Sequence, residues 1–141
     1  MIYVAEPSPL YRVRPPLVVD CSLLAAVLFD EPERAQAEQR MAGHALHAPT
    51  LLRHELAQVA LTKVRRGEPA VAALEGLRDY QMQAIAHHDT DAVGQFELGQ
   101  RYGLSAYDAA YLWLAIQLRA PLATFDRKLG DAAQAHFDDA R

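Results

Sequence analysis

The chain has 141 residues, with 14 Lys and Arg against 18 Asp and Glu, and its formal net charge is −4. This length predicts one compact domain, and a hydrophobic content of 51% excludes a disordered chain. The negative charge argues against a protein that holds nucleic acid on a broad basic surface, but not against an enzyme that touches it locally. The single cysteine, Cys21, excludes an internal disulfide framework and a cysteine-rich zinc site.

The first sixteen residues are expected to form an irregular arm. Prolines at positions 7, 9, 15 and 16 remove backbone donors and fix φ, and the segment lacks the apolar core of a signal peptide. Elsewhere Arg or Asp interrupts every apolar stretch before it reaches the roughly 18 residues of a membrane span. We therefore expect an arm over 1–16, one domain over 17–141, no membrane attachment and a cytoplasmic protein.

Short apolar segments alternate with segments of helical pattern along the rest of the chain. The expected strands are 17–19, 45–49, 82–86 and 121–125. The expected helices are 22–29, 32–43, 50–66, 69–80, 90–103, 105–118 and a short one after 126. Thr50 and Ser105 are expected to cap two of these helices. The alternation predicts an α/β fold, a three-layer α/β/α sandwich with a central parallel sheet.

Two of the acidic residues follow predicted strands. Asp20 ends the first strand and Asp126 ends the last. In open parallel sheets the functional crevice lies outside the carboxyl ends of the strands, so both positions point to one edge of the sheet. Each residue also fits a simpler role as the cap of the helix that follows it.

Two further acids lie at unusual places on predicted helices. At 100° per residue, Glu55 falls inside the apolar arc formed by Leu52, Leu56 and Val59, where a lone carboxylate is costly unless it is paired, protonated or bound to metal. It could instead sit at the edge of that arc and pair with a cation. Asp108 lies three residues after Ser105, as in a capping box, and opens a helix that is apolar all round.

Converging carboxylates do not all stay ionised side by side without cations. Hard oxygen ligands, with no histidine pair at metal-ligand spacing, favour Mg²⁺ or Mn²⁺. Such a cluster suits phosphodiester hydrolysis, in which bound ions activate a water molecule and stabilise the leaving oxygen. We expect Asp20, Glu55, Asp108 and Asp126 to be both the metal ligands and the catalytic residues.

Four segments of the sequence resemble the PIN-domain nucleases, and within them the VapC-type toxins of bacterial toxin–antitoxin pairs. The segments are LVVDCS at 17–22, PTLLRHELAQVAL at 49–61, YGLSAYDAA at 102–110 and PLATFDRKL at 121–129. The resemblance implies a parallel sheet flanked by helices and a Mg²⁺- or Mn²⁺-dependent endoribonuclease. It also implies an RNA substrate, a cognate antitoxin and a homodimer.

The same resemblance places the acids of the family on Asp20, Glu55, Asp108 and Asp126. It also places hydroxyl side chains at Ser22 and Thr124, where they would orient a carboxylate or a bound water. Each hydroxyl could equally be an ordinary residue of a helix start or a strand. The arm over 1–16 departs from the family, whose first strand begins close to the initiator.

Other residues and other functions also fit parts of the sequence. Arg53, Arg127 and Lys128 could hold RNA phosphates beside the acidic site. The six histidines are better explained as surface residues than as ligands, and Tyr107, Tyr111 and Trp113 as core or subunit-contact residues. The alternative function is a PIN-fold binding or regulatory module without catalysis. A phospho-acceptor signalling domain fits less well, because it requires a pair of acids at its start and a Lys that closes the last strand.

Overall fold

The computed structural model describes residues 1–5 and 14–140, and its centre is a sheet of four parallel strands. The strands are β1 (Pro16–Val19), β2 (Ala45–Pro49), β3 (Ile85–His88) and β4 (Leu122–Ala123). Their order in the sheet is β3-β2-β1-β4, so the chain builds the sheet outward from β1 and then returns to the other side of β1. Val18 pairs with both neighbours of β1, with His47 in β2 and Leu122 in β4.

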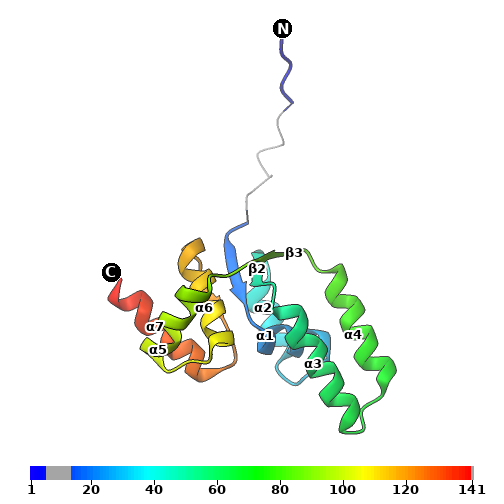
Figure 1. Cartoon of the computed structure of the whole chain (residues 1–141). Coiled ribbons are helices and arrows are strands. Elements are labelled where there is room, and N and C mark those ends of the chain that lie inside the picture. Colours follow the sequence, from blue (N-terminus) through cyan, green and yellow to red (C-terminus); the bar gives the residue numbers. More distant parts are fainter. Residues whose placement is uncertain (6–13, 141) are drawn as a thin grey trace.

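The described part of the chain has seven helices, six between the strands and one after β4. They are α1 (Cys21–Leu28), α2 (Arg34–Met41), α3 (Leu52–Arg65), α4 (Ala70–Met82), α5 (Ala92–Tyr102), α6 (Ala106–Leu118) and α7 (Arg127–Asp139). Parallel crossovers are right-handed, so reversing direction after β3 moves the next helices to the other face of the sheet. Figure 1 shows α1–α4 on one side of β1 and α5–α7 on the other. The predicted three-layer α/β/α sandwich is confirmed.

The hydrophobic core lies between the sheet and the helices. Leu17, Val18 and Val19 of β1 are fully buried, because helices cover both faces of this central strand. Helix α6 is buried over Ala109–Leu112 and packs against β1, β2 and β4. The sequence predicts that this helix is apolar on all sides, and in the structure the helix lies inside the fold.

Several predicted boundaries differ from the structure. Thr50 does not cap α3, which begins after Leu51 without a side-chain cap. Helix α4 continues to Met82 because no breaker follows Tyr80, and β3 therefore starts only at Ile85. Strand β4 is two residues long instead of five, and the helix after it, α7, is thirteen residues long and not short.

The amino-terminal arm is described only in part. Pro16 belongs to β1, so the strand begins one residue inside the predicted arm. Residues 1–5 are exposed, whereas residues 6–13 of the arm lie outside the described residues. Among the described residues, no helix combines the length and the apolar character that a membrane span requires.

Two pairs of side chains correct the prediction of surface histidines. Nδ1 of His47 lies 2.9 Å from Nε2 of His88, so the two rings share a hydrogen bond across β2 and β3. His87 points the other way and hydrogen-bonds the hydroxyl of Tyr80 on α4. His47, His87 and His88 are therefore partly buried and not free surface residues.

Candidate active site

The two strand-end acids lie where the connections of the sheet diverge. The chain leaves β1 toward β2 and β3, and it comes back to β4 on the opposite side of β1. Asp20 follows β1 directly, and Asp126 comes three residues after the end of β4. Neighbouring parallel strands whose connections run in opposite directions leave a crevice at their carboxyl ends. Asp20 therefore lies at the point of the sheet edge where the connections reverse direction.

Asp20 is the most firmly held of the four acids. Its side chain is only 6% exposed, and its oxygens accept three hydrogen bonds. Oδ1 accepts from the backbone N–H of Leu23 at 3.1 Å and from Oγ of Ser22 at 2.7 Å, while Oδ2 accepts from Oγ1 of Thr124 at 2.5 Å. Asp20 is thus both the cap of α1 and a carboxylate fixed in one orientation.

The hydroxyls of Ser22 and Thr124 join the ends of β1 and β4. Oγ of Ser22 also accepts the backbone N–H of Phe125 at 2.9 Å, and Oγ1 of Thr124 accepts that of Asp126 at 2.9 Å. The two hydroxyl oxygens lie 3.3 Å apart. Each hydroxyl therefore contacts both Asp20 and the segment that carries Asp126, so the two hydroxyls hold the ends of β1 and β4 together.

Glu55 lies in the first turn of α3 and is partly buried. Leu52 and Leu56 on either side of it are fully buried, so the helix turns Glu55 toward the protein. Its Oε1 accepts a hydrogen bond of 2.5 Å from the hydroxyl of Tyr111, a residue of α6 that is 1% exposed. Glu55 is therefore held from the opposite side of the sheet.

Asp108 and Asp126 each belong to a helix start. Ser105 caps α6 by accepting the backbone N–H of Asp108 at 3.1 Å, as the sequence predicts. Asp126 caps α7 by accepting the N–H groups of Lys128 at 2.9 Å and Leu129 at 3.3 Å. The capping role read from the sequence holds for both helix starts, and it leaves Oδ2 of Asp126 without a hydrogen bond to a described residue.

The charges of the four acids act on one another. Burial raises the pKa of Asp20, and the charge of Asp108 raises it further against the effect of the three hydrogen bonds. Burial also raises the pKa of Glu55, with additional effects from Asp108 and Asp20. The pKa of Asp108 is raised by burial and by the charge of Asp126. Burial and neighbouring carboxylates thus disfavour the ionisation of Asp20, Glu55 and Asp108.

The donor set suits a hard divalent cation. All four side chains offer oxygen, and none of them forms an ion pair with a cationic side chain in the described part of the chain. As they stand, no three His, Cys, Asp or Glu side chains among the described residues are close enough to hold one ion. The carboxylate oxygens have the chemistry of a Mg²⁺ or Mn²⁺ site, and the four side chains would need to lie closer together to enclose the ion.

The three predicted RNA-binding cations have different surroundings. Lys128 lies near enough to the acids to lower the pKa of Asp108. Arg127 is almost fully exposed and forms an ion pair of 3.7 Å with Asp131. Arg53 lies instead beside Tyr80 and His87, where its charge lowers the pKa of the histidine. Of the three, Lys128 is thus the one whose charge acts on the site.

Sequence reasoning missed two neighbours of the acids. Tyr111 was assigned to the core or to a subunit contact, although a buried tyrosine hydroxyl needs a partner and Tyr111 lies one helical turn after Asp108. Cys21 is close enough to Glu55 and Asp20 for their charges, together with burial, to raise its pKa to about 12. The thiol therefore stays neutral and adds no charge to the site.

Comparison with known proteins identifies the family. The family model described as "PIN domain" matches residues 17–135. The chain belongs to the PIN-domain family. Ribonuclease VapC3 of Pyrobaculum aerophilum is 32% identical over 82% of this chain and 92% of that protein. Ribonuclease VapC9 of Mycobacterium tuberculosis is 36% identical over 84% of this chain and 92% of that protein.

Solved structures of PIN-fold proteins have the same architecture. The crystal structure of PAE2754 from Pyrobaculum aerophilum has a TM-score of 0.69 at 21% identity and covers 84% of this chain and 80% of that one. VapC20 of Mycobacterium tuberculosis, a toxin that cleaves the sarcin–ricin loop, has a TM-score of 0.61 at 15% identity, with coverages of 82% and 94%. At these identities the structures support the fold of the PIN domain.

Proposed function

We propose that this PIN-domain protein is a metal-dependent endoribonuclease that hydrolyses RNA phosphodiester bonds and acts as the toxin of a toxin–antitoxin pair. The observation that carries the proposal is the set of four acids whose charges act on one another, none of which forms an ion pair with a described cationic side chain. The names of the VapC ribonucleases that the chain resembles support the same activity.

Asp20, Glu55, Asp108 and Asp126 would hold Mg²⁺ or Mn²⁺, directly or through water. An ion held there would lower the pKa of a water molecule and would offset negative charge on the phosphate. Burial and, to a smaller extent, neighbouring acids raise the pKa values of Asp20, Glu55 and Asp108, so these carboxylates favour a bound cation.

The chain supplies orientation around this site. Ser22, Thr124 and the N–H of Leu23 fix Asp20, so its carboxylate does not need to reorganise during the reaction. Tyr111 fixes Glu55 from the other face of the sheet. Ser22 and Thr124 would thus act through Asp20 without touching the substrate, and Lys128 would offset charge on the RNA near Asp108.

The proposal extends to organisation and partners. The arm over 1–16 would lie outside the catalytic unit, which would span 17–141. In the cytoplasm the protein would form a homodimer and would be neutralised by a cognate antitoxin, as its resemblance to the VapC proteins implies. Sedimentation analysis of the purified chain tests the dimer, and co-purification with the product of a neighbouring gene tests the antitoxin.

Charge-neutral variants test the catalytic proposal. Asp20→Asn and Asp108→Asn should lower RNA cleavage by more than about 100-fold, since each removes one charge from the site. Both variants should stay folded by circular dichroism, because Asn can still cap α1 and because the cap of α6 is the side chain of Ser105. Full cleavage by both variants would refute the site, and no cleavage by the wild type would favour a non-catalytic module.

Metal binding is tested separately from cleavage. Titration calorimetry of the EDTA-treated protein should show Mn²⁺ binding that weakens at least tenfold in Asp108→Asn. Arg127→Gln is the matched control, because Arg127 is exposed and paired with Asp131. Equal Mn²⁺ affinity of all three proteins would exclude Asp108 as a ligand.

A further inference from the structure

A cavity lies between β4 and α2, next to Asp20. Its volume is about 570 Å³, within the range of small-molecule sites. Thr124 and Phe125 line it on one side, and Gln36, Gln39 and Arg40 of α2 line it on the other. Since Thr124 also hydrogen-bonds Asp20, the cavity begins one side chain away from the carboxylates.

The side chains that α2 presents to this cavity have no partners among the residues that the structure describes. Gln36, Gln39 and Arg40 form no side-chain hydrogen bond or ion pair with any other residue that the structure describes. Gln36 and Arg40 are four residues apart and share one face of the helix. An arginine and two amides are therefore free to bind a ligand beside the site.

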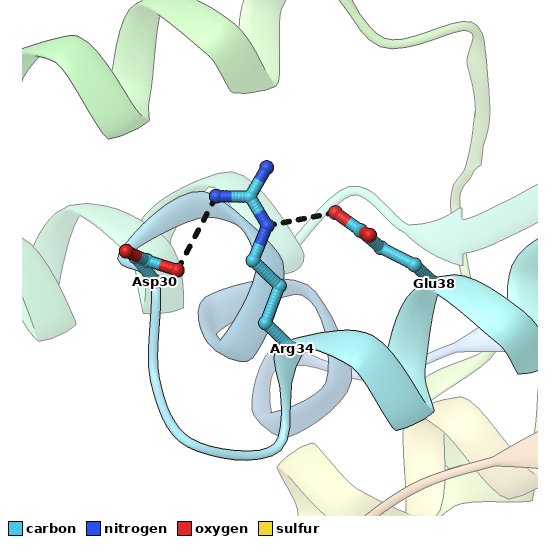
Figure 2. Close-up of polar contacts among 3 residues, drawn as sticks. All are labelled: Asp30, Arg34 and Glu38. Carbon is cyan, nitrogen blue, oxygen red and sulfur yellow. Dashed lines mark hydrogen bonds and ion pairs between the residues drawn. The ribbon is translucent and has the colours of Figure 1, made fainter.

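Arg34, the other arginine of α2, has a structural role because its side chain contacts two acids. Arg34 donates from Nε to Oε1 of Glu38 at 2.7 Å and from Nη1 to Oδ1 of Asp30 at 3.5 Å, as Figure 2 shows. It lies two residues before Gln36 and thus on the opposite face of the helix. Its charge is neutralised twice, whereas the charge of Arg40 is not.

Charge also distinguishes the cavity from its neighbour across Phe125. The cavity of α2 and β4 has no Asp or Glu among its lining residues and contains Arg40 and His44. The neighbouring cavity is lined by Glu31 and Glu33. A polyanion that reaches the carboxylates is repelled by the cavity of Glu31 and Glu33 and attracted by the cavity of α2 and β4.

We propose that this cavity is a nucleotide subsite that binds RNA next to the scissile phosphate. Arg40 binds a flanking phosphate, Gln36 and Gln39 hydrogen-bond the edge of a base, and Phe125 offers a ring on which the base stacks. The subsite rests on the proposed ribonuclease function and adds where the substrate strand leaves the acids, along β4 toward α2.

The test compares two arginines of the same helix. Arg40→Gln and Arg34→Gln each change the net charge by −1, so their comparison removes the effect of total charge. Both are placed in the Asp108→Asn background, and binding of a labelled mixed-sequence twelve-nucleotide RNA is followed by fluorescence anisotropy over a range of KCl concentrations.

We expect Arg40→Gln to weaken RNA binding about fivefold or more and to reduce the slope of log Kd against log [KCl] by roughly 0.7, the value of one phosphate contact on a single strand. Arg34→Gln should leave the slope unchanged. Equal effects of the two variants would overturn the subsite. Binding of an oligoglutamate peptide with the same dependence on Arg40 would also overturn it, because the cavity would then be a surface for acidic proteins.

The outcomes separate the subsite from the ribonuclease function. If the wild type cleaves RNA and Arg40→Gln changes neither binding nor cleavage, only the subsite is wrong. If RNA binding depends on Arg40 but the wild type does not cleave, only the ribonuclease is wrong. Gln36→Ala with Gln39→Ala should alter the preferred cleavage sequence on a randomised RNA without changing the salt slope, and an unaltered preference contradicts base recognition by α2.

Discussion

The hydroxyl of Tyr111 donates a hydrogen bond of 2.5 Å to Oε1 of Glu55, which joins helices on opposite faces of the sheet. Burial and the charge of Glu55 raise the pKa of Tyr111, so the hydroxyl remains a donor at physiological pH. The bond thus joins Glu55, a proposed metal ligand, to Tyr111, a residue of the hydrophobic core. Removing it should therefore affect both metal binding and stability.

Tyr111→Phe keeps the ring in the core and removes only the donor. We expect a loss of about 1–2 kcal/mol in the free energy of unfolding, as for a hydrogen bond to a charged group. Mn²⁺ affinity should fall several-fold in calorimetry, because Glu55 loses its fixed orientation. Tyr107→Phe is the control on the same helix, since Tyr107 is 67% exposed, and it should change neither quantity. Unchanged Mn²⁺ affinity in Tyr111→Phe would mean that the bond serves packing alone.

Thr124→Val and Thr124→Ser separate the hydroxyl from the shape of the side chain. Valine leaves Oδ2 of Asp20 and the N–H of Asp126 without their partner, so RNA cleavage should fall about 10- to 100-fold and stability by about 1–3 kcal/mol. Serine keeps the hydroxyl and should retain most of the activity. Cleavage assays and urea denaturation measure the two effects, and equal activity of Val and Ser variants would rule out orientation by the hydroxyl.

The histidine pair predicts how stability depends on pH. Burial and the charge of His88 lower the pKa of His47 in the folded protein. Its contribution to stability is therefore present above its unfolded pKa, near 6.5, and is lost as the pH falls through the lower folded value. His47→Gln should be about 1 kcal/mol less stable than wild type at pH 7.5, and the difference should narrow toward pH 5.5 in thermal unfolding.

His54→Gln is the control for this series, because His54 is exposed on α3. It should follow the wild type across the whole pH range. A constant gap between wild type and His47→Gln would show that the ring of His47 contributes through packing and not through its titration.

Gly76→Ala tests the contact of α4 with the end of α1. A Cβ at this position would lie 2.8 Å from the carbonyl oxygen of Leu28 and 2.5 Å from the ring of Phe29. Because a backbone oxygen has little room to move, the variant should lose about 1–3 kcal/mol of stability, against the gain of 0.5–1 kcal/mol that alanine brings to an exposed helix position. Urea denaturation decides between the two signs, and a more stable variant would show that α4 shifts freely on α1.

The sequence predicted those parts of the site that follow from local patterns. Asp20 could be placed because an apolar strand precedes it, and Ser105 because a cap three residues before an acid is a local signal. The two-residue length of β4 was not predictable, since its pairing with β1 ends where Thr124 turns to Asp20. That ending depends on a residue more than a hundred positions away.

Contacts between distant segments account for the other gaps. The bond between Tyr111 and Glu55 spans 56 residues, and no spacing along the chain announces it. The pairing of His47 with His88 depends on the register of β2 and β3, which the sequence leaves open. The sequence does not distinguish Arg40 from Arg34, because only the structure shows which of the two arginines has acidic neighbours.

The hydrogen bonds that fix Asp20 have a consequence for the order in which the site forms during protein synthesis. Asp20 is among the first residues of the domain to be made, yet Thr124, which fixes its second oxygen, is translated 104 positions later. A nascent chain that has not yet reached β4 therefore carries its first acid without the partner that orients it. The four acids can therefore take their final arrangement only after almost the whole domain has been made.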